Sequence, residues 1–88
     1  MIRIWAKIIK KHRIITDMEY EIPSNKMVWS LFFKVLSEIC NTLDIPTPVL
    51  LKNHTLNFAK YNYVLFYPSD FVESVDFDML SLEFVKYT

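Results

Sequence analysis

Apolar and polar residues alternate in two stretches near the beginning of the chain, residues 2–9 and 14–22. In both stretches the even positions are mainly apolar, and most odd positions carry charged residues, with one tryptophan. The outward-facing residues are Arg3, Trp5 and Lys7 in the first stretch and Asp17, Glu19 and Glu21 in the second. A period of two predicts the strands of an antiparallel hairpin with one apolar and one charged face, on which opposite charges pair across the strands.

Residues 10–13, with the sequence KKHR, connect these two predicted strands. The chain contains no glycine, and the tightest hairpin turns favour glycine because their central residues have positive φ. We therefore expect a loop of about three to five residues. His12 is the residue expected to adopt a positive φ.

Apolar residues then recur every three or four positions between residues 23 and 44, which predicts a long helix capped by Ser24. One apolar row consists of Val28, Phe32, Val35, Ile39 and Leu43, and a second row consists of Trp29, Phe33, Leu36 and Cys40. Two rows exceed what one side of a small sheet needs. We therefore expect the second row to face another helix or solvent.

The two prolines of residues 44–48 end this helix, and Thr47 with Pro48 resembles the start of another. A shorter helix is predicted over residues 49–62, with one packed side formed by Leu51, His54, Phe58 and Tyr61. Residues 63–68 and 79–88 alternate again and predict two more strands.

The expected fold is α+β: a four-stranded, mainly antiparallel sheet in the order β-β-α-α-β-β, with one long and one shorter helix on one face. Residues 1–88 are expected to form a single domain.

Composition excludes several classes of function. Ten basic and ten acidic residues cancel, so the chain lacks the overall basic bias of a general nucleic-acid binder. Without glycine, a P-loop, a GxGxxG turn or an EF-hand loop cannot form. The single cysteine excludes an internal disulfide. Arg3 and Lys7 interrupt any signal peptide, and no apolar run approaches the roughly 18 residues of a membrane span. A cytoplasmic location is expected.

Four carboxylates lie close together in residues 67–80, at Asp70, Glu73, Asp76 and Asp78. Apolar residues interleave them, so we expect the acids to point outward. Asp70 and Glu73 are interpreted as a reciprocal capping pair of a short helix, and residues 75–78 as a polar turn. No metal site and no cofactor are predicted.

Cys40 and His54 are the other candidates for chemistry. A nucleophilic cysteine needs a base within hydrogen-bond reach, but Cys40 falls among aliphatic residues in the middle of a helix, which favours an inert thiol. His54 is expected to pack on the apolar side of its helix, with one ring nitrogen bonded to a carbonyl. The chain is therefore predicted not to be an enzyme. The third alternative is catalysis through Asp70, Glu73 or His54, or metal binding by the acidic stretch of residues 70–78.

Nucleic-acid binding through the predicted hairpin is the second alternative. Its candidate residues are Trp5, Lys7, Lys10, Lys11 and Arg13. Cations beside an aromatic platform suit a single strand, since they neutralise phosphates while the ring stacks on a base. The acidic residues of the second strand favour the simpler interpretation of a charge-neutral surface.

Trp29 and Phe33 support the leading hypothesis. If their row faces outward, the two aromatic side chains form a patch of the kind that marks protein interfaces. The chain is then a small non-catalytic interaction or accessory module whose partner is another protein or a second copy in a homodimer.

The chain contains the strand Ile4-Trp5-Ala6-Lys7, the helix break at Ile45-Pro46, and the stretches Asp70-Phe71-x-Glu73 and Asp76-Phe77-Asp78 before the last predicted strand. On these residues, the chain resembles small uncharacterised proteins of low-GC Gram-positive bacteria over nearly its whole length. The resemblance implies no particular activity, cofactor or partner.

Overall fold

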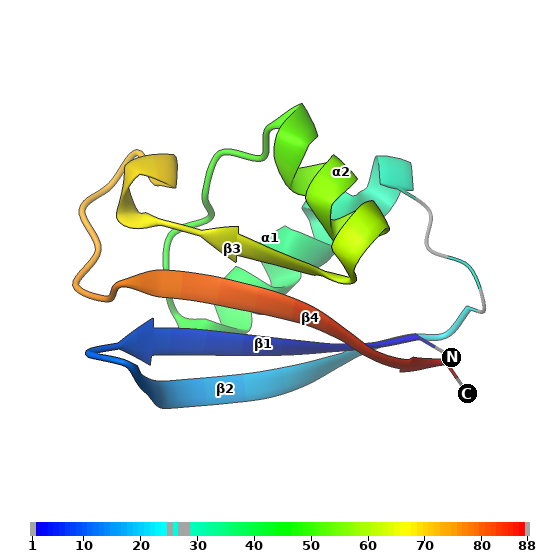
Figure 1. Cartoon of the computed structure of the whole chain (residues 1–88), viewed down its shortest axis with the longest axis horizontal. Helices are drawn as coiled ribbons and strands as arrows, with labels where there is room; N and C mark the ends of the chain where they lie inside the picture. Colours follow the sequence, from blue (N-terminus) through cyan, green and yellow to red (C-terminus); the bar gives the residue numbers. More distant parts are fainter. Residues whose placement is uncertain (1, 25, 27–28, 88) are drawn as a thin grey trace.

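The strands nearest the two ends of the chain lie side by side in the centre of one antiparallel sheet (Figure 1). The structure, a computed structural model, describes residues 2–24, 26 and 29–87. Its elements are β1 (Ile2–Lys10), β2 (Arg13–Ile22), the 3-10 turn η1 (Trp29–Leu31), α1 (Phe32–Leu43), α2 (Lys52–Tyr61), β3 (Tyr63–Phe66), the 3-10 turn η2 (Pro68–Asp70) and β4 (Met79–Tyr87). The strand order is β2-β1-β4-β3, and all neighbours are antiparallel. The predicted α+β fold and its element order are confirmed.

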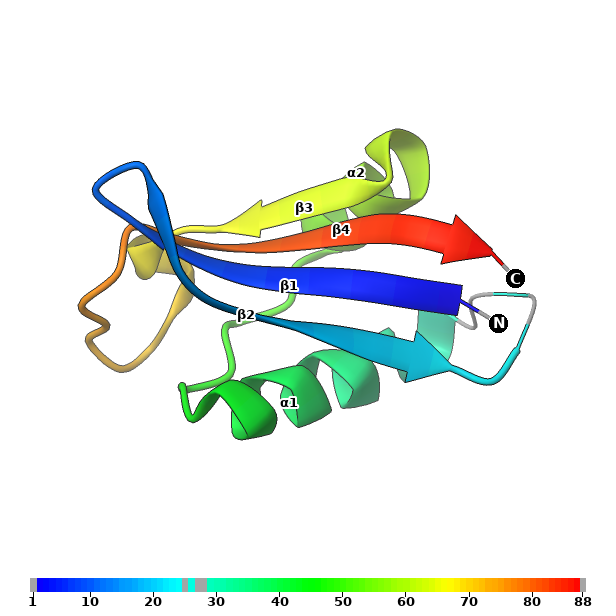
Figure 2. The same ribbon diagram turned by 90° about the horizontal axis from the view of Figure 1, so that it is seen from below.

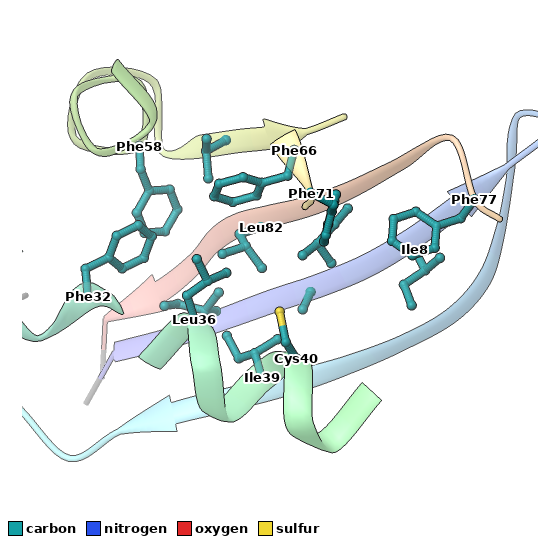
Figure 3. Packing of buried hydrophobic residues seen from close by; sticks show 14 of the residues in the cluster. Ile8, Phe32, Leu36, Ile39, Cys40, Phe58, Phe66, Phe71, Phe77 and Leu82 are labelled. Atoms are coloured by element: carbon teal, nitrogen blue, oxygen red, sulfur yellow. The ribbon is translucent and has the colours of Figure 1, made fainter. Parts of the chain in front are cut away.

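Both helices cover the same face of the sheet, α1 on the side of β2 and α2 on the side of β3 (Figure 2). The core between these layers takes the even residues of β1, as their period predicted, and side chains from both helices (Figure 3). Phe32 of α1 stacks on Phe58 of α2, with ring centres 5.2 Å apart. Within the described residues, neither helix has the length and apolar character needed to cross a membrane.

The connection between β1 and β2 is shorter than predicted. Only Lys11 and His12 separate the strands, with φ values of 52° and 64°, so the expected loop of three to five residues is wrong, whereas the positive φ of His12 is confirmed. Positive φ at both central residues matches the twist of the strands. The Asp78 carboxylate accepts the Lys11 backbone N–H at 2.7 Å, which helps to hold the turn without glycine.

The first helix begins later than predicted. Ser24 does not cap it, because its hydroxyl accepts the N–H of Lys26 at 3.2 Å in a local turn. Val28 lies outside the described residues. The helix ends at Leu43, and the next residue, Asp44, has a φ of 58° and donates its N–H to the Asn41 carbonyl. The next N–H, from Ile45, bonds to the Cys40 carbonyl at 3.0 Å, and together these bonds form a Schellman cap.

The buried face of α1 combines the two predicted rows. Its buried residues are Phe32, Leu36, Ile39 and Cys40. The second row is therefore divided, because Leu36 and Cys40 are buried in the core and Phe33 faces solvent. An apolar stripe that covers more than about 100° of the helix circumference accommodates buried residues from both rows.

The second helix also starts later than predicted. Thr47 and Pro48 precede it in an irregular segment, and the helix begins at Lys52. His54 and Phe58 are buried as expected, but Leu51 and Tyr61 are exposed. The start is set by His54, whose Nδ1 accepts the N–H of Leu51 at 3.0 Å.

Candidate functional site

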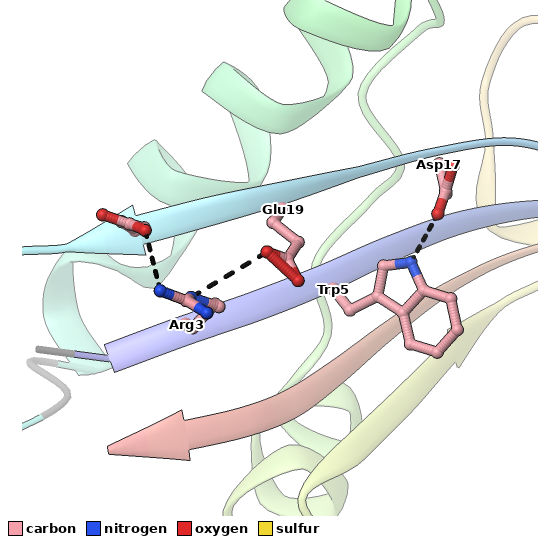
Figure 4. A network of polar contacts seen from close by, with 5 residues as sticks. Arg3, Trp5, Asp17 and Glu19 are labelled. Carbon is pink, nitrogen blue, oxygen red and sulfur yellow. Dashed lines mark hydrogen bonds and ion pairs between the residues drawn. The ribbon is translucent and has the colours of Figure 1, made fainter. Parts of the chain in front are cut away.

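The face of the sheet without helices carries the predicted charge pairs (Figure 4). Arg3 lies opposite Glu21 and contacts it at 3.1 Å, with Glu19 at 3.9 Å. The indole N–H of Trp5 donates to the Asp17 carboxylate at 2.8 Å. The acidic residues of β2 thus engage Arg3 and Trp5, whereas Lys7, which lies opposite Asp17, contacts Glu83 of β4.

Lys7 covers the Trp5 ring that was proposed as a stacking platform. Its ammonium lies 4.0 Å from the ring centre and 3.7 Å from Glu83, and its side chain is only 13% exposed. Lys10 lies 4.0 Å from Asp76. The hairpin therefore brings Trp5 and Lys7 together, but it places carboxylates beside the cations. Lys11 and Arg13 are exposed at the turn.

The proposed interface at the start of α1 is described only in part. Trp29 belongs to η1, but its side chain lies outside the described residues. Phe33 is 52% exposed, and nearby Leu31 is 54% exposed. An apolar surface therefore exists at Phe33, and whether Trp29 extends it stays a prediction.

The four carboxylates of residues 70–78 have different surroundings. Asp70 accepts the N–H of Tyr67 at 2.9 Å, Asp78 accepts that of Lys11, and Asp76 lies near Lys10. The predicted capping pair with Glu73 is wrong, because η2 ends at Asp70 and the Asp70 side chain reaches back to residue 67. Among the described residues, no three His, Cys, Asp or Glu side chains are placed to hold a metal ion.

His54 joins the starts of α2 and η2. Its Nδ1 accepts the Leu51 N–H and therefore carries no proton, so the proton of the neutral ring is on Nε2. Nε2 lies 3.5 Å from the Asp70 carboxylate. The predicted carbonyl partner of the ring is thus wrong. With both ring nitrogens engaged and the residue 5% exposed, this pair is suited to holding two segments together rather than to transferring protons.

Cys40 is fully buried in the core. Burial raises the pKa of its thiol from the usual 9.0 to about 11, although a hydrogen bond with the Thr47 side chain offsets part of this increase. A protonated, enclosed thiol is a poor nucleophile.

The free energy of unfolding is expected to fall by about 2 kcal/mol between pH 9 and pH 11 because of Cys40. Its folded pKa lies above the unfolded value, so the stabilisation is complete below pH 9 and is lost as the pH rises towards the folded pKa. Urea denaturation across this range measures the decline. Cys40→Ala should make it smaller without abolishing it, because hydrogen bonding to Glu38 also raises the pKa of Tyr20. An equal decline in the variant would contradict this assignment.

A groove between β3 and α2 was missed from the sequence. It has a volume of about 210 Å³, and it is lined by Asn57, Tyr61, Tyr63, Val64, Leu65 and Tyr67. The three tyrosines are 53%, 48% and 46% exposed. Rings of this size, held on a strand and a helix end, offer both apolar area and hydroxyl groups.

β3 lies at the edge of the sheet, so one side of its backbone has no neighbouring strand. Residues of an antiparallel pair alternately bond to the neighbour and point away from it. The Phe84 N–H bonds to the Asn62 carbonyl at 2.7 Å, which sets this alternation. The N–H and C=O of Tyr63 and Leu65 therefore point to the free edge. Within the described part of the chain, these outward groups have no hydrogen-bond partner.

The charges that α2 brings to the groove are positive, and Glu83, which lies opposite Tyr63 on β4, contacts Lys7 at 3.7 Å. Residues 45–69 contain Lys52 and Lys60 and no acidic residue. The Lys60 ammonium lies 5.3 Å from the centre of the Tyr61 ring, beside the groove. The opposite edge strand, β2, carries three acidic residues, so the two edges of the sheet differ in sign.

Comparison of the chain with known protein families, curated proteins and solved structures found no match. The resemblance to Gram-positive proteins stays a prediction. The groove is therefore interpreted from its own geometry.

Proposed function

We propose that the protein is a non-catalytic interaction module that binds another polypeptide through the groove between β3 and α2. The observation that carries this proposal is the free backbone edge of Tyr63 and Leu65, flanked by exposed tyrosines. Tyrosine is enriched where proteins bind one another, because it buries a large area at a low entropic cost. A neutral chain of this size suits an adaptor better than a general polyanion binder.

The groups that would support catalysis are committed to other contacts. Both ring nitrogens of His54 face partners, and Cys40 is enclosed in the core. Nucleic-acid binding through the hairpin is supported less well, since Glu83 and Asp76 lie beside Lys7 and Lys10. These contacts favour a polypeptide partner over a polyanion.

Photocrosslinking at the groove tests the proposed function. The photoreactive residue p-benzoylphenylalanine, introduced at Tyr63, is expected to form adducts with a partner in cells that produce the protein. The aromatic replacement keeps the character of the position, and Tyr63 lies directly on the groove. The same residue at Val72, which is 87% exposed and lies outside the groove, is expected to give only background adducts. Mass spectrometry of the adducts identifies the polypeptide.

The same experiment separates the alternative surface. Adducts at Phe33 but not at Tyr63 would move the interface to the start of α1. An adduct with twice the mass of the chain would identify a second copy, and light scattering would then show a dimer that Phe33→Ser dissociates. Absence of adducts at both positions would contradict an interaction module.

A further inference from the structure

We infer that the groove binds an extended, acidic segment of another protein, which adds to the sheet as a fifth strand beside β3. This inference rests on the proposed function and specifies both the chemistry of the partner and its mode of binding. Strand addition uses backbone hydrogen bonds for affinity and side-chain pockets for selectivity. The edge of β3 offers both.

The free backbone edge has defined ends. The Asn62 N–H bonds to Phe58 and its C=O to Phe84. At the other end, the Tyr67 N–H bonds to the Asp70 carboxylate, and its C=O accepts the Asp70 N–H. Only Tyr63 and Leu65 lie between these positions with outward N–H and C=O groups. An extended backbone can satisfy all of these groups, whereas a helix, whose backbone groups bond internally, cannot.

The side chains beside this edge match an added strand. Asn57 and Tyr61 of α2 form the second wall of the groove, across from the β3 backbone. Alternate side chains of an added strand point to opposite faces, so every second residue would enter the groove. The lining is largely aromatic and aliphatic with an amide and hydroxyl groups at its rim, which suits medium-sized apolar side chains at these positions.

The charges near the groove indicate that the bound segment is acidic. Lys52 and Lys60 are the only charged residues of positions 45–69, so carboxylates flanking the bound strand would be attracted. A second copy of the chain is a less suitable occupant. It would bring its own Lys52 and Lys60 to the interface, and these like charges would repel the lysines of α2. The β2 edge is not equivalent, because Asp17, Glu19 and Glu21 would repel an acidic strand and a bulge near Ile15 interrupts its ladder.

Selection from a displayed library of random linear peptides of about eight residues tests this inference. The full chain is the bait. Enriched peptides are expected to contain acidic residues together with alternating β-branched or aromatic residues. Their binding is expected to shift the amide signals of Tyr63 and Leu65 in a ¹H–¹⁵N spectrum of the protein.

Leu65→Pro removes one outward N–H without removing a bond to β4, because proline is tolerated at an edge position that donates only outward. It is expected to weaken binding of an enriched peptide by about tenfold or more. The matched variant Leu65→Ala keeps the N–H and loses only side-chain contact with the groove, so it is expected to weaken binding less than Leu65→Pro does. Lys60→Glu reverses an exposed charge beside the Tyr61 ring and is expected to weaken binding of acidic peptides by about threefold to tenfold. If Leu65→Pro does not fold, Lys60→Glu still tests the inference.

Three results would overturn the inference. The first is that the enriched peptides contain no acidic residues. The second is that the amide signals that shift are centred on Phe33 or on the β1–β2 turn instead of β3. The third is that no peptides are enriched. If adducts at Tyr63 accompany any of these results, the interaction module stands and only the extended acidic partner is rejected. If both experiments fail, the groove is not a binding site.

Discussion

Replacing Phe58 with alanine is expected to lower the free energy of unfolding by about 3–5 kcal/mol. The Phe58 ring is 1% exposed, stacks on Phe32 and meets Phe84 at 5.8 Å between ring centres. Phe58 therefore connects α2 to both α1 and β4. A domain of this size is expected to have a stability of only about 5 kcal/mol, so the loss would leave a large unfolded fraction.

Urea denaturation followed by circular dichroism measures this effect, and Leu56→Ala on the same helix provides the control. Leu56 is 56% exposed, and alanine is a better helix former than leucine, so the control is expected to change stability by less than about 0.5 kcal/mol. If the two variants were equally stable, α2 would not be anchored by Phe58, and the position of the second groove wall would need another explanation.

The second large effect is expected for Asp70→Ala, with a loss of about 2–4 kcal/mol. The Asp70 carboxylate caps Tyr67 and faces Nε2 of His54. Its removal leaves the N–H of a buried imidazole without an acceptor, and it frees the end of β3 at the same time. Such a loss exceeds that of an ordinary exposed carboxylate, because the imidazole cannot reach water.

The controls for this prediction separate hydrogen bonding from charge. Asp70→Asn keeps an acceptor oxygen in a side chain of the same shape and is expected to recover at least half of the loss. Asp76→Ala removes a carboxylate whose side chain is 92% exposed and is expected to cost less than about 0.5 kcal/mol. A loss at Asp70 as small as that at Asp76 would show that the contact with His54 contributes nothing.

The sheet could be predicted from the sequence because its strands have a strongly one-sided environment. The even residues of β1 from Ile2 to Ile8 pack against the core, and the odd residues from Arg3 to Lys7 face the charged surface. A slip of one position would exchange the two faces completely. The period therefore locates β1 and β2 and assigns the two faces of β1, and the charges of Arg3 and Glu21 agree with the observed register.

The turn and the helix starts could not be predicted because contacts distant in sequence or specific local bonds determine them. The two-residue turn is held by Asp78, which lies 67 positions from Lys11. The start of α2 depends on the ring of His54 bonding back to Leu51. Serine is a residue type that often caps helices, but the Ser24 hydroxyl forms its hydrogen bond within a local turn. Residue propensities indicate that these residues suit a turn or the end of a helix, but they do not determine which local hydrogen bond forms.

The groove was missed for a different reason. Tyr63 and Tyr67 were visible as part of an alternating segment, but alternation does not reveal which strand lies at the edge of a sheet. The strand order β2-β1-β4-β3 leaves the short β3 unpaired on one side. A run of tyrosines without charged residues, in a segment whose only charges are lysines, was the available signal.

The pairing of β1 with β4 in the centre of the sheet also affects how the chain folds during synthesis. The β1–β2 hairpin can form early, but the strand that completes its apolar side lies at Met79–Tyr87. Until the ribosome has released that segment, Ile2, Ile4 and Ile8 have no β4 beside them. Pairings between distant segments form slowly, and exposed strand edges are prone to aggregation during that delay. Nascent chains stalled before residue 79 are therefore expected to require chaperones more than the finished protein does.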